Sequence, residues 1–226
     1  MKTNQEYKNA ALDRLRGNWA PAVIATIVYM VLAIVCAGSA QVPTILQGQA
    51  VPHAEFNMGL ALGCGGASFL LSLFILGPVL VGFANANRLL YERRDYNVTR
   101  NMTDIAMSNY LHKVLGVFLM ELKIVLWTFL FIIPGIVMSF AYAMTPYILE
   151  EHPEIGAWEA STRSREMMKG HKFDLFWLYL SFIGWFLLAM LTAGIGFLWL
   201  EPYMQGAVAG FYNDLKAEQG EEAVTA

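Results

Sequence analysis

Three ionisable side chains stand within long apolar stretches of the sequence: Glu121, Lys123 and Glu201. A charge in the hydrocarbon of a bilayer is costly, so such residues mark either a buried ion pair or a path for protons or solutes. Lys123 and Glu121 are two residues apart and point to different sides of a helix, whereas Glu201 comes from a distant segment. We therefore expect Lys123 and Glu201 to form a structural pair between two helices, with a proton or solute path as the alternative.

Other residue patterns indicate little chemistry. The four histidines show no i, i+4 spacing of a helical metal site and lie in separate segments: His53, His112, His152 and His171. The sequence contains no Gly-x-Ser-x-Gly, no phosphate-binding loop and no dinucleotide fingerprint. The acidic run Glu150, Glu151 and Glu154 is interpreted as a solvated helix cap rather than a cation site. We expect no catalytic, cofactor-binding or metal-binding residue and no enzymatic activity.

The composition predicts an all-α membrane protein. Of the 226 residues, 57% are hydrophobic and only 15% are charged, a balance far from that of soluble domains. No ionised residue occurs in 18–54, 56–87 or 175–200, and each block exceeds the roughly 20 residues that cross a bilayer. The net charge of -3, without a basic run that includes aromatic residues, argues against nucleic acid. The lipid bilayer is the expected partner.

The first apolar segment is expected to remain as a membrane span. Residues 20–37 follow a charged start and precede small residues, as in a cleavable secretory signal. The apolar core of such a signal has about 7 to 15 residues, and this segment is longer. A retained first span is therefore the prediction, with a cleaved signal as the alternative.

Lys and Arg indicate one side of the membrane, because short cytoplasmic loops carry an excess of them. They gather before the first span, between residues 88 and 113, and between residues 163 and 172. Segment 42–58 has neither Lys nor Arg and is expected outside. We predict a multi-pass protein of the bacterial cytoplasmic membrane with both termini in the cytoplasm.

The pair Pro134-Gly135 interrupts an apolar run that lies between two basic segments. As one helix, residues 114–149 would be about 54 Å long, much more than a roughly 30 Å hydrocarbon core. Pro cannot donate a backbone hydrogen bond and Gly tolerates left-handed dihedrals, so the pair predicts a tight turn of a helical hairpin. A kink within one tilted span is the alternative. Six spans result, near 20–41, 58–86, 115–133, 136–150, 174–193 and 196–213.

The domain organisation is simple. Residues 1–17 predict an amphipathic cytoplasmic helix, with a capping box at Thr3 to Glu6 and a stop at Gly17. Residues 18–214 form a single membrane domain, and residues 215–226 form an acidic cytoplasmic tail. A second surface helix is expected over 153–169, where a stripe should pack on the bundle: Ala157, Ser161, Ser164 and Met168.

Small residues indicate where helices approach closely. Gly59 and Gly63 are four residues apart, as are Gly206 and Gly210, and this spacing lets helix backbones meet in lipid. Packing within the chain is expected, with a homo-oligomer or a contact to another membrane protein as the alternative. The two cysteines, Cys36 and Cys64, are expected to be buried thiols rather than a disulfide.

The run IPGIVMSFAYAMTPYILEEHPEIGAWEASTRSREMMKGHKFDLFWLYLSFIGW, followed by GIGFLWLEPY and FYNDL, resembles the bacterial integral-membrane family of unknown function DUF975 over roughly residues 120 to 215. More distantly, a Pro-Gly hairpin and a later Pro-Tyr are similar to the membrane domain of some glycerophosphodiester phosphodiesterases, whose catalytic domain is absent here. The resemblance implies six spans and supplies no activity and no catalytic residues. Glu201 departs from the family, in which an apolar residue is more usual.

Three functions follow from this sequence. The first is a non-catalytic membrane protein that organises, senses or assists other envelope components. The second is a small-solute or ion transporter or channel, which would need more polar groups along its spans. The third is an intramembrane enzyme, for which no nucleophile with an adjacent base is visible.

Overall fold

The described part of the chain is helical. The computed structural model describes residues 2–39, 58–92 and 97–225, and it describes side chains at 2–36, 72–92 and 97–220. The helices are α1 (Asn4–Leu15), α2 (Trp19–Ser39), α4 (Met58–Tyr91), α5 (Val98–Met107), α6 (Tyr110–Leu130), α7 (Ile132–Ala141), α8 (Thr145–Glu151), α9 (Ala157–Met167), α10 (Lys172–Leu180), α11 (Ile183–Leu191) and α12 (Phe197–Thr225). The predicted all-α class is confirmed.

Four helical stretches are long and apolar enough to cross a membrane. Within the described residues they are Trp19–Cys36, Ser72–Tyr91, Ile132–Glu151 and Lys172–Leu191. The expected spans at 115–133 and 196–213 are helical but carry the ionisable residues Glu121, Lys123 and Glu201. Length and composition therefore support a membrane protein with four candidate spans in the described part of the chain.

Helix α1 forms because its first turn is capped by its own side chains. The Thr3 backbone N–H donates to the Glu6 carboxylate at 2.6 Å, and the Glu6 N–H donates to Thr3 Oγ1 at 3.4 Å. Gly17 then takes a φ of 82°, which suits glycine after a helix. The stripe of Tyr7, Ala11 and Leu15 is buried, and α1 packs mainly on α12. A helix is therefore present where it was expected, and its apolar face meets protein; its cytoplasmic location stays a prediction.

The turn between α6 and α7 lies at Phe131, not at Pro134-Gly135. Phe131 has an extended backbone (φ -158°, ψ 140°) between the two helices. Pro134 instead occupies the first turn of α7, where backbone N–H groups have no partner within the helix and proline is tolerated. The expected left-handed dihedrals are also wrong, because the described glycines with positive φ are Gly17, Gly170 and Gly194.

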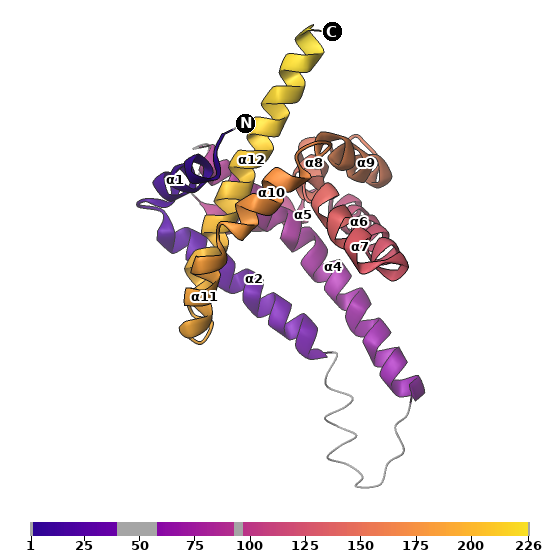
Figure 1. The fold of residues 1–226 in the computed structure, drawn as a ribbon. Coiled ribbons are helices and arrows are strands. Elements are labelled where there is room, and N and C mark those ends of the chain that lie inside the picture. The colour runs from indigo at the N-terminus through magenta and orange to yellow at the C-terminus, as the bar shows by residue number, and fades with distance from the viewer. Residues whose placement is uncertain (1, 40–57, 93–96, 226) are drawn as a thin grey trace.

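Gly135 has a different role, which is close packing. A Cβ added there would lie 2.7 Å from Thr128 Cα of α6, so only glycine allows this approach of α7 to α6. Figure 1 shows the two helices side by side, with the chain reversing between them. The second predicted break, at 192–196, is confirmed: Ala193 and Gly194 have φ values of 53° and 88° between α11 and α12.

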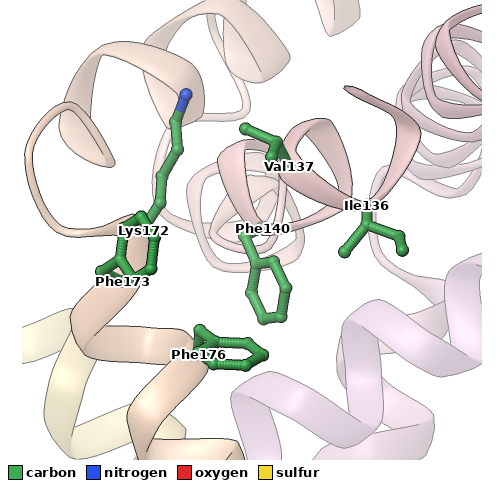
Figure 2. A pocket seen from close by; sticks show the side chains of 6 residues that line it. All are labelled: Ile136, Val137, Phe140, Lys172, Phe173 and Phe176. Carbon is green, nitrogen blue, oxygen red and sulfur yellow. The ribbon is translucent and has the colours of Figure 1, made fainter. Parts of the chain in front are cut away.

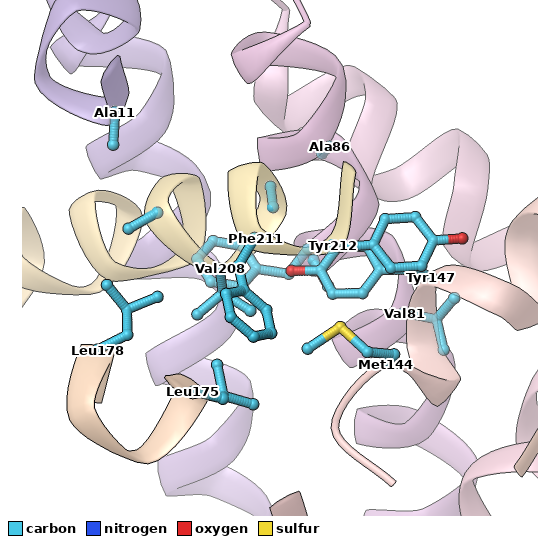
Figure 3. Close-up of a cluster of buried hydrophobic side chains, with 14 of the residues drawn as sticks. Ala11, Val81, Ala86, Met144, Tyr147, Leu175, Leu178, Val208, Phe211 and Tyr212 are labelled. Carbon is cyan, nitrogen blue, oxygen red and sulfur yellow. The ribbon is translucent and has the colours of Figure 1, made fainter. Parts of the chain in front are cut away.

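The core surrounds the middle of α12. Tyr147 of α8 and Tyr212 of α12 stack with ring centroids 4.8 Å apart. Figure 3 shows this pair next to Met144, with Leu175 and Val208 nearby. These residues come from segments distant in the sequence, so the core joins α8, α10 and α12.

Helix α9 packs against the bundle as predicted. Ser161, Ser164 and Met168 are fully buried. Ser164 Oγ donates to the Ala141 carbonyl at 3.0 Å and accepts from the Met144 N–H at 3.2 Å. These bonds hold α9 to the end of α7, so the segment is an integral part of the fold.

Gly206 and Gly210 are used for packing within the chain. A Cβ at Gly206 would lie 3.2 Å from Ala11 Cβ, and one at Gly210 would lie 2.6 Å from Tyr91 Cζ. Helix α12 therefore approaches α1 and α4 through these glycines. Gly59, Gly63 and Cys64 lie outside the residues whose side chains are described, so their expected roles stay predictions.

Candidate functional site

Glu151, at the end of α8, joins three helices. Its carboxylate accepts from Arg88 of α4, from the Tyr212 hydroxyl at 2.7 Å and from Lys216 Nζ at 2.8 Å. The Arg88 and Glu151 side chains are only 7% and 12% exposed. The Arg88 guanidinium also lies 5.9 Å from the Tyr212 ring centroid. This network connects α4, α8 and α12 through a buried ion pair.

Glu150 makes a second buried pair. Its carboxylate lies 2.6 Å from Lys113 Nζ of α6, and the Lys113 side chain is fully buried. Lys113 also donates to the Ser108 carbonyl and hydroxyl, each at 2.7 Å. The interpretation of this acidic run as a solvated cap is wrong for Glu150 and Glu151, because adjacent helix residues point to different neighbours and each meets a cation. The sequence already predicts Arg88 and Lys113 on the same side of the membrane as this acidic run. That shared side could have indicated the two ion pairs.

The N-terminal segment is attached to α12 and to the α10–α11 junction. Lys2 Nζ lies 2.7 Å from Asp214 Oδ1, and this hydrogen bond raises the pKa of the lysine. The Tyr7 hydroxyl donates to the same carboxylate at 3.0 Å. Lys8 Nζ donates to the Ser181 carbonyl at 2.8 Å, and burial lowers the pKa of Lys8.

Lys123 does not pair with Glu201, and that prediction is wrong. Its ammonium donates to Ser161 Oγ and to the Trp158 carbonyl at 3.4 Å, and it lies 3.6 Å from the centroid of the Trp158 ring. Glu201 instead accepts from Gln205 Nε2 at 3.2 Å, one turn along α12. The reason is that α9 covers this face of α6 and supplies the partners.

Glu121 and Glu201 lie on different helices, α6 and α12. Both side chains are half-buried. Of the three ionisable residues singled out in the sequence, Lys123 is the one that binds another helix in the described part of the chain.

A cavity of about 390 Å³ opens beside Lys123. Two cationic side chains line it among aromatic, aliphatic and hydroxyl groups: Lys123, Arg165, Leu126, Trp127, Tyr142, Trp158 and Thr162. Among the described residues that line it, none is acidic. This arrangement can accept an anion.

A second cavity is apolar. It has a volume of about 280 Å³ between α7 and α10. Figure 2 shows Phe140 and Phe176 meeting across it and the Lys172 ammonium pointing away from these rings. Their ring centroids are 5.9 Å apart. Such a space suits a hydrocarbon chain and offers no group for chemistry.

The described residues contain no group of three or more His, Cys, Asp or Glu side chains that could hold a metal ion. Burial lowers the pKa of His112, which favours its neutral form.

The fold and its buried charges define the class: a helical protein with several helices long and apolar enough to cross a membrane. Residues 130–219 match the family model described as Protein of unknown function (DUF975). This segment supports the resemblance seen in the sequence and contains α7 to α11 and most of α12. No curated protein matches the chain. No solved structure matches it either. The comparisons do not show the distant similarity to the membrane domain of glycerophosphodiester phosphodiesterases.

Proposed function

We propose that the chain is an integral protein of the bacterial cytoplasmic membrane that organises, senses or assists other envelope components without catalysing a reaction. The observation that carries this proposal is how its buried charges are used. Arg88 pairs with Glu151, and Lys113 pairs with Glu150, each across helices. Charges engaged in this way hold the helices together and are not available to a substrate.

The exposed apolar surface supports a location in lipid. At the α6–α7 turn, large apolar side chains are 65% to 92% exposed: Phe129, Leu130, Phe131, Ile132 and Ile133. At the end of α11, Leu191 is 82% exposed. A contiguous apolar patch of this kind would associate in water, whereas lipid chains cover it without cost.

The charge pattern requires an even number of crossings between the basic segments. The six spans predicted from the sequence satisfy this requirement. Two crossings by α2 and α4 satisfy it equally if the α6–α7 and α10–α12 hairpins enter and leave the same leaflet. Both arrangements place the two termini in the cytoplasm.

Helix α9 favours two crossings and two re-entrant hairpins. It packs beside Lys123, and its outward face carries charged residues that cannot lie in hydrocarbon: Glu159, Arg163, Arg165 and Glu166. The level of Lys123 is therefore near the membrane surface. Phe131 follows Lys123 by eight residues, which is about 12 Å of helix and less than half of a roughly 30 Å core.

The second hairpin supports the same arrangement. Lys8 of α1 binds the Ser181 carbonyl, which places the α10–α11 junction at the level of a charged surface helix. From Ser181 to Thr192 the helix extends about 16 Å. In Figure 1, α1 and α9 lie toward the top of the view, α4 descends furthest from them, and both hairpin turns descend less far.

Cysteine labelling tests the arrangement. In a background without Cys36 and Cys64, Gln47→Cys should react with an impermeant thiol reagent from outside, although Gln47 itself lies outside the described residues. Lys169→Cys, at an exposed site after α9, should not react from outside. Phe131→Cys should also stay unlabelled from outside. Labelling of Phe131→Cys would instead support six crossings, and labelling of Lys169→Cys would contradict both arrangements.

A transporter is the second candidate, and buried polar atoms favour it. Asn85 Oδ1, Thr145 Oγ1 and the Tyr147 hydroxyl are buried without a hydrogen-bond partner in the described part of the chain. Glu201 of α12 is half-buried. Atoms of this kind usually hold water, and a chain of waters could conduct a proton or a small solute.

Liposome flux assays separate the two functions. Purified protein should give no ion or solute flux above that of empty liposomes. Flux that Glu201→Gln abolishes, and that the exposed control Glu154→Gln leaves intact, would establish the transporter and refute the non-catalytic organising role.

A further inference from the structure

We propose that the cavity between α6, α7 and α9 binds the phosphate group of an anionic lipid. The inference rests on the membrane location proposed above, and it adds a ligand class and a binding site. The volume of about 390 Å³ is within the range of small-molecule sites.

The cavity carries uncompensated positive charge. Lys123 and Arg165 both line it. Among the described lining residues, none is acidic. Two cations that face one space repel each other, so an anion between them would be stabilised by both.

The Lys123 ammonium is held in place by α9. An ammonium group has three N–H donors, and those of Lys123 reach Ser161 Oγ and the Trp158 carbonyl. Ser161 Oγ donates its own proton to the Trp158 carbonyl at 2.9 Å, so its lone pairs face the lysine. The ammonium also lies 3.6 Å from the centroid of the Trp158 ring, so an anion in the cavity would meet Lys123 chiefly through its positive charge.

Arg165 is the second cation of the site, and its exposed side chain can change conformation to meet a ligand. Its side chain is exposed on α9, and a guanidinium offers a planar fork that binds phosphate oxygens in pairs. Because Arg165 is at the surface, it can approach a ligand without rearranging the core.

The surroundings favour a lipid over free phosphate. Leu126 and Trp127 line the same cavity and are 60% and 41% exposed. They continue into the apolar α6–α7 turn, so a ligand with a phosphate in the cavity would lay its hydrocarbon along this turn. Trp158, which is 63% exposed, is of the type that gathers at the headgroup level of membranes.

Native mass spectrometry of the full-length protein in neutral detergent tests the site. The probes are phosphatidylglycerol, phosphatidylcholine and inorganic phosphate. The wild type should bind phosphatidylglycerol in preference to phosphatidylcholine. Arg165→Gln should weaken that binding about fivefold, the effect of removing one cation near a lipid surface. Arg163→Gln, a matched change at an exposed residue of the same helix that does not line the cavity, should leave it unchanged.

The outcomes are distinct. Equal binding of the two lipids, or equal effects of the two variants, overturns the proposal. If inorganic phosphate displaces the lipid from the wild type, the cavity binds soluble phosphate and the lipid assignment is overturned. The measurement involves neither flux nor topology, so this inference and the proposed function can fail separately.

Discussion

Removing the charge of Glu151 should destabilise the protein more than removing any exposed charge. Glu151→Gln removes the main counter-charge of Arg88, whose side chain is 7% exposed, and leaves it only the longer 3.6 Å contact with Glu92. Breaking a buried pair in this way costs about 3 to 5 kcal/mol. Lys216, which binds the same carboxylate, is 53% exposed and should contribute at most about 1 kcal/mol. The weakened pairing of the buried arginine therefore dominates the expected loss.

Thermal unfolding in detergent measures this loss. For a chain of this size, 1 kcal/mol corresponds to about 2 to 4 °C, so the melting temperature should fall by about 6 to 20 °C. The control is Glu154→Gln, since the Glu154 side chain is 65% exposed. The double variant Arg88→Met with Glu151→Leu should recover part of the loss because both members of the closest buried pair are removed together, although Glu92 then loses its contact with Arg88. A fall for Glu151→Gln no larger than the control's, or a double variant as unstable as Glu151→Gln, would refute the reasoning.

Three further results are expected. Gly135→Ala should lower the melting temperature because its Cβ would lie 2.7 Å from the α6 backbone, at a cost of about 1 to 3 kcal/mol. The control Gly184→Ala has open space around its Cβ and should not lower it. Lys123→Met and Glu201→Leu should have additive effects on thermal stability, since each binds other partners; recovery in the double variant would contradict the structure. The capping hydrogen bonds hold the pKa of Glu6 below its ordinary 4.5, so its contribution to stability is present above pH 4.5 and is lost as the pH falls through the lowered pKa. Wild-type melting temperature should therefore drop more than that of Glu6→Gln between pH 6 and 3, and parallel curves would refute this.

The sequence predicted best those features that depend on neighbouring residues. The capping box at Thr3 to Glu6 and the break at 192–196 involve groups a few positions apart, so residue types and spacing are sufficient. The sequence placed the turn at Pro134 rather than at Phe131. Proline ends a helix only where its missing N–H would break a hydrogen bond within the helix. Pro134 lies in the first turn of α7, where that N–H would have no partner within the helix.

Long-range partners could not be read from the sequence. Lys123 required a partner, and the sequence offered Glu201 as the acid on another span. The partner is α9, whose serine and tryptophan bind an ammonium without carrying charge. Glu150 and Glu151 were expected in solvent, but each has a cationic partner on another helix. These cations lie 37 and 63 residues away in the sequence, on α6 and α4.

The distribution of Lys and Arg indicates on which side of the membrane a loop lies, but it does not indicate how deeply the helices on either side of that loop enter the bilayer. A hairpin that crosses twice and a hairpin that enters and leaves one leaflet return the chain to the same side, so both give the same distribution of Lys and Arg. Depth follows only from what packs on the hairpin. Here, charged surface helices contact both hairpins partway along their length, through Ser161 of α9 and Lys8 of α1. If those helices stay at the membrane surface, the apolar turns beyond them extend about 12 and 16 Å, which places the Lys123 cavity at the level of the lipid phosphates.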